Sequence, residues 1–321
     1  RALVGTTYKQ QGPQAAVRLG HQIVAGVVKE QRIQAWVQKF KPQTKPGVLT
    51  CFRGGMRSQL AQVWCRDARV SVPRIQGGTK SFRNFLLQQL LIRSQEKMTV
   101  ISGATGVGKS LLLRELATDL AVLDLEREAN HRGSAFGGFE QAQPSQITFE
   151  NRLSYQLIKL EEKIKKQGTL LLEDESRLIG HCVLPESLFS RLRRSETVFI
   201  DESLEVRTQN TFDEYIFATA LSRPDEEKAV HVLDHYQTCV QRISRKLGGL
   251  RTDEILKDLA TARQIFQVNR DLEPNKIWIR KLLEWYYDPL YFKSLQQRKP
   301  TFIFRGSKRD VTQFLLQQKR N

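Results

Sequence analysis

Short apolar runs alternate with longer amphipathic stretches through the part of the chain that follows residue 97. Five runs have the apolar character and the flanking turn or polar residues of strands, and they cover residues 98–101, 121–126, 169–177, 197–202 and 301–304. The stretches between them show the spacing of apolar residues that is typical of helices. Strands that alternate with helices at these intervals predict an α/β fold with a parallel sheet covered on both faces.

The longest helical stretch runs from residue 204 to about residue 298 and contains few turn signals. The strand-like run 301–304 and a closing helical stretch follow it. We therefore predict that residues 204–298 are a helical insertion and that the last strand returns to the sheet. Aromatic residues between positions 278 and 293 are interleaved with basic ones, which fits either a packed helix face or stacking on unpaired bases.

The first 97 residues have a different organisation. Residues 14–40 show helical spacing, with Gly20 and Gly26 as expected interruptions. The other predicted elements are a short strand at 48–50, a helix over 59–68, a strand and turn at 73–78, and a helix over 81–94. We predict a smaller α/β domain over residues 1–90 and a second domain over residues 91–321.

The segment MTVISGATGVGKS carries the phosphate-binding P-loop pattern between a strand and the start of a helix. The glycines let successive backbone N–H groups point at one anion, and the helix N-terminus adds partial positive charge. Lys109 is expected to reach the terminal phosphate, and the hydroxyl of Ser110 to contact Mg²⁺. The predicted phosphate-binding residues are Gly103, Thr105, Gly106, Gly108, Lys109 and Ser110. The motif predicts phosphate binding without naming the substrate.

Two polar segments that follow predicted strands are candidates for a second part of this site. The run 169–177 ends in three carboxylates and looks like a Walker B segment, whose acid holds Mg²⁺ directly or through water. Asp174 and Glu175 are the candidates, which the sequence does not rank, and a solvated acidic turn is the alternative. The glycine-rich segment 130–138 contains His131 and Arg132 and fits either an anion or nucleotide site or an ordinary surface loop.

A second candidate site lies in CFRGGMRS, between the strand at 48–50 and a helix. Cys51 is placed there to be a thiolate, because the helix N-terminus and the side chains of Arg53 and Arg57 would lower the pKa of its thiol. We take these three residues as the candidate catalytic group. The spacing Cys-x5-Arg occurs in rhodanese-like sulfurtransferases and in cysteine phosphatases, but phosphatases usually carry His where this chain has Thr50. Sulfur-type transfer is therefore favoured over phosphatase chemistry, and a structural cysteine in a turn is the alternative.

The positive charge of the chain is unevenly distributed. The 321 residues carry a net charge of +17, and residues 1–97 hold 17 Lys and Arg against 3 Asp and Glu. A basic surface of this size fits a polyanion such as nucleic acid, whose binding weakens with salt as counterions are released, although it also fits a merely soluble surface. No apolar run approaches the ~20 residues of a membrane span. The four cysteines show neither zinc-ligand spacing nor a disulfide framework, so we expect a cytoplasmic protein without a structural metal and without a membrane partner.

The order and spacing of several motifs resemble those of the bacterial tRNA 2-selenouridine synthase family, in which a rhodanese-like domain precedes a P-loop domain. The motifs are TYKQQG, CFRGGMRS, IQGGTKSFR, GATGVGKS, DLEREANHRGSAFG, LEDESRLIG and WYYDPLY, and they extend through most of the chain. In this resemblance the essential rhodanese cysteine falls on Cys51, and the Walker A lysine and hydroxyl residue fall on Lys109 and Ser110. The earlier strands of a complete rhodanese domain are not in the sequence, which starts at Arg1, so we expect that an N-terminal part is missing.

The resemblance implies two steps on 2-thiouridine at the wobble position, in the anticodon loop of certain tRNAs. Geranyl diphosphate alkylates the sulfur, and selenophosphate then supplies selenium with loss of the geranylthio group. The expected partners are thus tRNA and these two small molecules, with Mg²⁺ as a candidate ion and no tightly bound organic cofactor. Two alternatives stay open: a P-loop NTPase or kinase that acts on RNA with a degenerate rhodanese module, and a plain sulfurtransferase.

Overall fold

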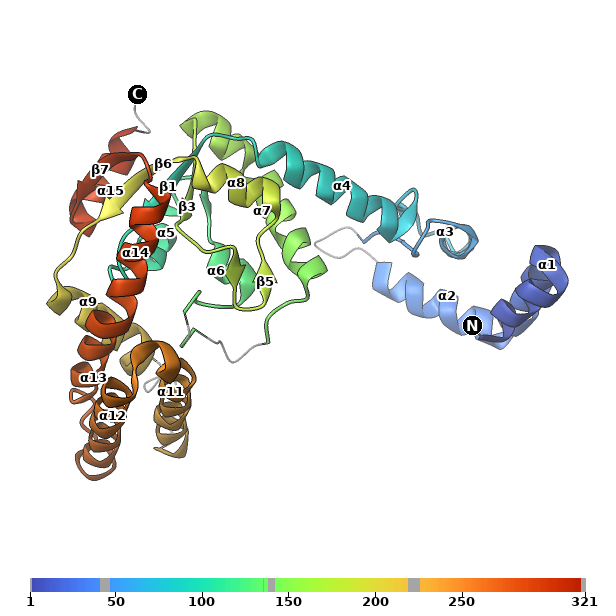
Figure 1. Ribbon diagram of the computed structural model, residues 1–321. Helices are drawn as coiled ribbons and strands as arrows, with labels where there is room; N and C mark the ends of the chain where they lie inside the picture. The colour runs from blue at the N-terminus through green and yellow to red at the C-terminus, as the bar shows by residue number, and fades with distance from the viewer. Residues whose placement is uncertain (1, 41–46, 135, 138–141, 219–225, 319–321) are drawn as a thin grey trace. The chain divides into compact units, whose positions relative to one another are not determined.

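The computed structural model describes residues 2–40, 47–134, 136–137, 142–218 and 226–318 (Figure 1). The chain divides into two compact units, Arg1–Phe85 and Leu86–Asn321. Helix α4 (Gly78–Arg93) crosses this division, which lies a few residues before the boundary predicted at residue 90. Within the described ranges, no helix combines the length and the apolar character needed to cross a bilayer.

The second unit is built on a parallel sheet of five strands in the order β2-β3-β1-β6-β7. The strands are β1 (Met98–Ser102), β2 (Val122–Leu123), β3 (Leu170–Glu173), β6 (Glu196–Ile200) and β7 (Phe302–Gly306). Because β1 lies between β3 and β6, the carboxyl ends of these three strands meet at one edge of the sheet. Ligands of open parallel sheets bind outside this edge, so the topology places the P-loop beside the acids that follow β3.

Both faces of the sheet are covered, because successive side chains of a strand point to opposite faces. The covering helices are α5 (Lys109–Leu116), α7 (Gln146–Gln167), α8 (Glu186–Arg193) and α15 (Lys308–Gln318). Met98 and Val100 pack in one buried core with α7 and α8. Ile101 packs in the other with α5 and α15. The predicted α/β fold with a doubly covered parallel sheet is therefore confirmed for the second unit.

Two predicted strands are shorter than their sequence patterns indicated, because the run 169–177 forms a strand only to Glu173 and the run 121–126 only to Leu123. Strand β2 ends at Leu123, and the following residues form the short helix α6 (Leu125–Ala129). The carboxylate of Asp124 accepts a hydrogen bond of 2.8 Å from the backbone N–H of Arg127 and so caps this helix. Glu126 consequently lies on a helix and not at a strand end. The acidic segment after β3 similarly runs into a small antiparallel hairpin, β4 (Leu178–Ile179) with β5 (Cys182–Val183).

The predicted helical insertion is confirmed between β6 and β7, which pair directly with each other. It consists of α9 (Leu204–Phe212), η1 (Asp213–Phe217), α11 (Glu226–Leu247), α12 (Gly249–Asn269), α13 (Asn275–Leu282), η2 (Leu283–Tyr287) and α14 (Asp288–Arg298). Figure 1 shows α11, α12 and α13 grouped side by side. Trp278 and Tyr286 are buried in the insertion's own apolar core, so this aromatic stretch is mainly a packed helix face.

The first unit contains α1 (Ala2–Ile23), α2 (Val27–Phe40), α3 (Met56–Asp67) and the start of α4. Gly26, with φ of 57°, separates the first two helices as predicted, but Gly20 lies inside α1, and the kink falls at Gly12. The two short strands expected here reduce to one parallel bridge between Leu49 and Arg74. Residues 41–46, between α2 and the Leu49 bridge, lie outside the described residues.

Candidate functional site

The glycine positions of the P-loop are fixed by backbone conformation and by close neighbours. Gly103, Gly106 and Gly108 have φ of 151°, 87° and 82°, which side chains rarely adopt. A Cβ at Gly103 would lie 2.7 Å from the backbone oxygen of Ile200, and one at Gly106 would lie 2.6 Å from that of Arg207. The loop therefore needs glycine both for its curvature and for its packing against β6 and α9.

Lys109 lies over this loop as the first residue of α5. Its Nζ donates to the backbone oxygens of Gly103 at 2.8 Å and Ala104 at 3.4 Å. A phosphate in the loop would offer the ammonium a charged acceptor in place of these carbonyls. Thr105 lies within the loop, and Ser110 follows on the first turn of α5. The structure thus brings the six predicted phosphate-binding residues into one loop and helix start.

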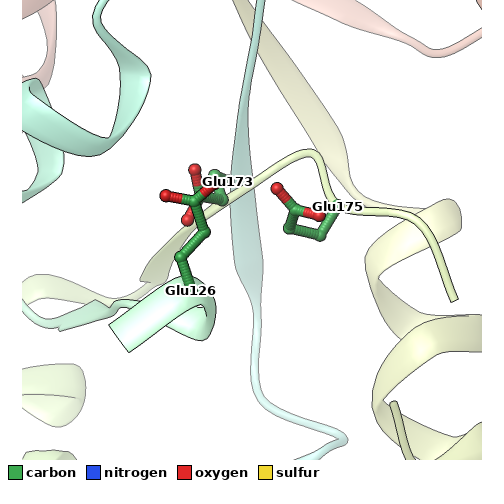
Figure 2. Close-up of side chains that lie close together, drawn as sticks. All are labelled: Glu126, Glu173 and Glu175. Atoms are coloured by element: carbon green, nitrogen blue, oxygen red, sulfur yellow. The ribbon is translucent and has the colours of Figure 1, made fainter. Parts of the chain in front are cut away.

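Three carboxylates converge beside Ser110. Glu126 comes from α6, Glu173 from the end of β3, and Glu175 from the segment after it, and their carboxylates point toward one another (Figure 2). One oxygen of each lies within 4.8 Å of the others. The Ser110 hydroxyl lies 2.8 Å from Oε2 of Glu126 and 3.0 Å from Oε2 of Glu173. Oε1 of Glu173 is buried and has no hydrogen-bond partner among the described residues.

The three carboxylates are held in an environment that opposes their ionisation. Burial is the main cause, and the charges of the neighbouring carboxylates add to it. The pKa of Glu126 is raised to about 8 and that of Glu175 to about 7, and the pKa of Glu173 lies well above its usual value. The positive charge of Lys109 offsets part of this effect at Glu175 and Glu173. A bound cation would therefore favour ionisation of all three at neutral pH.

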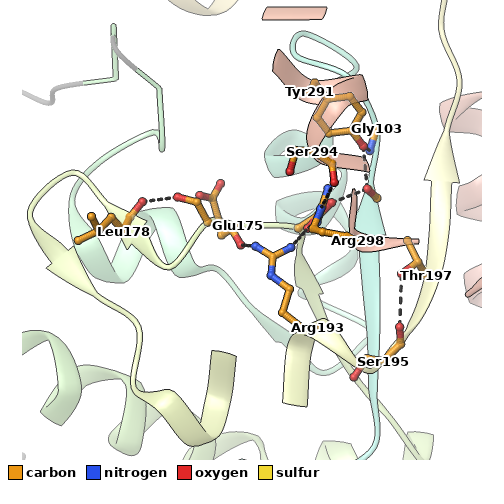
Figure 3. A network of polar contacts seen from close by, with 12 residues as sticks. Gly103, Glu175, Leu178, Arg193, Ser195, Thr197, Tyr291, Ser294 and Arg298 are labelled. Atoms are coloured by element: carbon orange, nitrogen blue, oxygen red, sulfur yellow. Dashed lines mark hydrogen bonds and ion pairs between the residues drawn. The ribbon is translucent and has the colours of Figure 1, made fainter. Parts of the chain in front are cut away.

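Asp174 belongs to a different set of contacts. Its carboxylate accepts from Arg193 at 2.9 Å, from Arg298, and from the hydroxyl of Ser102 at 2.6 Å. Burial by itself raises the pKa of Asp174, but these hydrogen bonds and the two arginine charges lower it below its ordinary value. Figure 3 shows Arg193 and Arg298 in this network, together with Tyr291. The carboxylate of Asp174 is thus committed to tying α8 and α14 to the sheet.

In the glycine-rich segment 130–138, the backbone at Gly133 lies close to the carboxylate of Glu175. A Cβ at Gly133 would lie 2.8 Å from the carboxylate of Glu175. Nδ1 of His131 accepts from the Gly133 N–H at 3.0 Å, and burial lowers the pKa of this histidine. Arg132 pairs with Glu214 at 3.4 Å. Residues 135 and 138 of the segment lie outside the described residues, and neither His131 nor Arg132 belongs to the carboxylate cluster.

The Cys51 loop lies in the first unit. Sγ of Cys51 lies 3.2 Å from Oγ of Ser58, on the first turns of α3. Partial burial opposes ionisation of the thiol, but hydrogen bonds from the Ser58 hydroxyl and from the backbone N–H groups of Ser58, Arg53 and Gly55 outweigh it. The pKa of Cys51 is therefore lowered to about 7. Arg53 acts through its backbone here, and its side chain and that of Arg57 are exposed.

Gly77 and Gly78, at the start of α4, pack against the backbone of the Cys51 loop. A Cβ at Gly78 would lie 2.0 Å from the backbone oxygen of Cys51, and one at Gly54 would lie 2.6 Å from the backbone nitrogen of Gly77. The N–H of Thr79 donates to the same Cys51 oxygen at 3.0 Å. Backbone segments far apart in the sequence thus meet at van der Waals distance, which orders the thiol relative to α3.

The comparisons with known proteins cover both units. Residues 96–321 match the family model described as the tRNA 2-selenouridine synthase AAA domain. A tRNA 2-selenouridine synthase of Nitrosomonas europaea is 42% identical over 339 residues, which cover 99% of this chain and 88% of the relative. The chain belongs to the tRNA 2-selenouridine synthase family. Relatives of the same name from Bdellovibrio bacteriovorus and Serratia proteamaculans are 42% and 40% identical, over 98% and 100% of this chain and 86% of each relative. No solved structure matches the chain.

Two acids of the carboxylate cluster, Glu126 and Glu173, were not predicted from the sequence. Glu173 is the last residue of β3 and pairs in register with Ile101, so it meets the helix that starts after the P-loop. The position of this acid, directly after three leucines of a buried strand, was the available signal. Glu126 had no such signal, because only the capped turn at Asp124 brings α6 to Ser110. Of the two acids that the sequence offered, the structure places Glu175 in the cluster and Asp174 in the arginine network.

The donor set at Ser110 fits a hard divalent cation. Carboxylate and hydroxyl oxygens are the ligands that Mg²⁺ takes in proteins, usually together with substrate phosphates. The unpartnered buried oxygen of Glu173 is the observation that favours an ion here, since buried oxygens are otherwise nearly always paired. Glu126, Glu173, Glu175 and Ser110 would hold such an ion beside the P-loop.

A cation site formed by these buried carboxylates makes thermal stability depend on pH and on Mg²⁺. Because burial raises the pKa values of Glu126 and Glu175 to about 8 and about 7, the folded protein binds more protons than the unfolded chain between pH 5 and 8. In EDTA we expect the melting temperature to fall as the pH rises through this window. At pH 8, added Mg²⁺ is expected to raise it again, as any ligand that binds only the folded state does.

Glu173→Gln is expected to weaken the Mg²⁺ response in this thermal unfolding measurement. The matched control is Glu128→Gln: Glu128 is a buried glutamate on the same helix α6 as Glu126, but its carboxylate accepts from Gln156 at 3.0 Å and lies outside the cluster. A melting temperature at pH 8 that is the same in EDTA and in Mg²⁺ would contradict the cation site.

Proposed function

We propose that this chain converts 2-thiouridine at the wobble position of tRNA into 2-selenouridine by two transfer reactions. Geranyl diphosphate first alkylates the sulfur. The selenium of selenophosphate then bonds to the carbon that carries the geranylthio group, which leaves as the thiolate, and hydrolysis of the selenium–phosphorus bond releases phosphate. The observation that carries the proposal is the presence, in a member of this family, of two loops suited to these two reactions. One is the P-loop with its carboxylate cluster, and the other is the loop around a thiol of lowered pKa.

The P-loop would hold the diphosphate of geranyl diphosphate. In the alkylation, the sulfur forms a bond to the first carbon of the geranyl chain while the carbon–oxygen bond breaks, and the diphosphate leaves with the electron pair. Lys109, the loop N–H groups and the N-terminus of α5 are positioned to stabilise the negative charge that grows on the leaving group. When bound at the carboxylate cluster, Mg²⁺ would add charge stabilisation on the same oxygens.

The Cys51 loop would serve the selenium step. We assign the first unit to a partial rhodanese-like module, supported by Cys51 between the Leu49 bridge and α3 and by the Cys-x5-Arg spacing to Arg57. At neutral pH about half of the thiol is ionised when its pKa is about 7. The thiolate would act as a nucleophile that attacks an activated intermediate of this step, and the leaving group of that intermediate would depart with its electron pair.

The tRNA would be bound in part by the basic N-terminal segment. Residues 1–97 carry 17 basic and 3 acidic residues, and such an excess of positive charge favours backbone phosphates. The wobble base would leave its stack to reach either site, at modest cost because the anticodon loop is single-stranded.

The proposal is tested by mass spectrometry of nucleosides from 2-thiouridine tRNA incubated with the protein. With geranyl diphosphate alone we expect S-geranyl-2-thiouridine, and with selenophosphate added we expect 2-selenouridine. Omitting geranyl diphosphate should leave the 2-thiouridine unchanged. ATP hydrolysis stimulated by tRNA, with every nucleoside unchanged, would instead support an RNA-dependent NTPase. Turnover of thiosulfate that does not need the P-loop would support a plain sulfurtransferase.

A further inference from the structure

Arg74 connects the parallel bridge of the first unit to the loop that carries Cys51. Its backbone pairs with Leu49 in this bridge, where the N–H of Ile75 donates to the Leu49 oxygen at 3.0 Å. Its partly buried side chain reaches the loop, and Nη1 donates to the backbone oxygen of Gly54 at 2.6 Å. A positive side chain from outside the loop therefore contacts one peptide group within it.

The guanidinium of Arg74 is itself held by α3. Nε of Arg74 donates to Oε1 of Gln62 at 3.4 Å. The amide of Gln62 is oriented in turn, because its Nε2 donates to the backbone oxygen of Val72 at 2.9 Å. With one nitrogen bonded to Gln62 and another to Gly54, the planar guanidinium has a defined orientation.

The orientation of the peptide between Gly54 and Gly55 decides which of its groups the thiol meets. In a planar trans peptide the C=O and the N–H point in opposite directions. Because the Gly54 oxygen points to Arg74, the N–H of Gly55 points back into the loop, where it is one of the backbone groups that favour the Cys51 thiolate. A charged donor on the oxygen also polarises the peptide and strengthens its N–H as a donor.

We infer that Arg74 is a positioning residue, which acts on the sulfur of Cys51 through the peptide between Gly54 and Gly55 without contacting the sulfur. The inference deepens the role that the proposed function gives to Cys51 and rests on that function only for the reaction served. Loss of the guanidinium would leave this peptide free to turn its N–H away from the thiolate. The thiol would then ionise at higher pH.

The other charged side chains around the loop act differently. Arg53 and Arg57 of the loop and Lys80 in the first turn of α4 are exposed, so water and salt screen their charges. Among the described residues, none of these three side chains donates a hydrogen bond to the loop backbone, as Arg74 does. Asp67, at the far end of α3, is the nearest acid along the chain.

The first test measures the pKa of the Cys51 thiol from the rate of alkylation by iodoacetamide as the pH is varied, with the modified peptide identified by mass spectrometry. In Arg74→Met we expect the midpoint to rise by about one pH unit, so that alkylation at pH 6 slows about tenfold while the plateau at high pH is unchanged. The control is Arg66→Met, the same substitution at an exposed arginine in the last turn of α3. An unchanged midpoint in folded Arg74→Met, or an equal rise in the control, would overturn the inference.

The second test follows the Gly55 amide by NMR in the unaltered protein labelled with ¹⁵N-glycine. We expect its resonance to move as the pH is raised through 7, because the N–H then faces a thiolate, and to stay in place in Cys51→Ser. In folded Arg74→Met the movement should be smaller. A Gly55 resonance that does not move in the unaltered protein would overturn the inference, and this measurement decides if Arg74→Met does not fold.

The selenium step separates this inference from the proposed function. If Cys51 acts there as a thiolate, Arg74→Met should form 2-selenouridine about tenfold more slowly at pH 6 and at a nearly normal rate at pH 9. Should the thiol midpoint move while selenation does not follow it, the proposed role of Cys51 fails and the positioning role of Arg74 stands.

Discussion

Lys109→Ala is expected to lower the rate of S-geranylation by about 100-fold or more at saturating tRNA. The ammonium of Lys109 lies over the P-loop, within 2.8 Å of the Gly103 oxygen, where it would meet the departing diphosphate. Charge that develops on a leaving group is stabilised most by donors already in position, so the loss should appear in the chemical step as well as in binding. The measurement is single-turnover formation of S-geranyl-2-thiouridine, followed by mass spectrometry of the nucleosides.

Lys97→Ala is the matched control for this prediction. Lys97 precedes the same strand β1 at its other end, is exposed, and pairs with Glu196 at 3.3 Å, so its removal changes the net charge equally without touching the loop. We expect its geranylation rate to stay within about twofold of the unaltered protein, since exposed ion pairs contribute little. Normal geranylation by Lys109→Ala would exclude the P-loop as the diphosphate site.

Cys51→Ser is expected to abolish selenation while geranylation continues, so that S-geranyl-2-thiouridine accumulates. The expected loss of the selenium step exceeds about 10³-fold, because removing a nucleophile costs most of the acceleration of its step. The thiol is positioned by the Gly78 contact and by Ser58, and its lowered pKa makes it a thiolate at working pH. The readout is the ratio of 2-selenouridine to S-geranyl-2-thiouridine after incubation with both small molecules.

The pH dependence of the selenium step separates this role from a structural one. Because the pKa of Cys51 is lowered to about 7, the rate should rise with pH and reach a plateau above pH 8, with roughly a tenth of the plateau at pH 6. Ser58→Ala removes a hydrogen bond that favours the thiolate, so the profile should move to higher pH. Cys65→Ala, a change at a fully buried cysteine on the same helix α3, should leave the profile in place. Normal selenation by Cys51→Ser would rule out the proposed role.

Local sequence patterns were sufficient for most of the fold. The strands β1, β3, β6 and β7 are short apolar runs bounded by turn residues, and their alternation with helices sets the parallel sheet. The pattern failed at β2, where the apolar Leu125 suggested a longer strand. There a side-chain cap competed with strand pairing, and the hydrogen bond from Arg127 to Asp124 favoured a helix. The pattern also overpredicted strands at residues 48–50 and 73–75. A strand needs a partner along its length, and these two segments pair only through the bridge between Leu49 and Arg74.

The sequence by itself determined the P-loop and the thiol loop, because each depends on residues that are adjacent in the chain. The glycines lie at fixed spacing before Lys109, and Ser58 lies in the first turn of α3, seven residues after Cys51, so both loops are formed by short segments of chain. Tertiary structure alone decided which acids face Ser110. Successive side chains at a strand end point to opposite faces, so Glu173 and Asp174 have different partners. The register of β3 with β1 places Glu173 beside Ser110, and the arginines of α8 and α14 pair with Asp174.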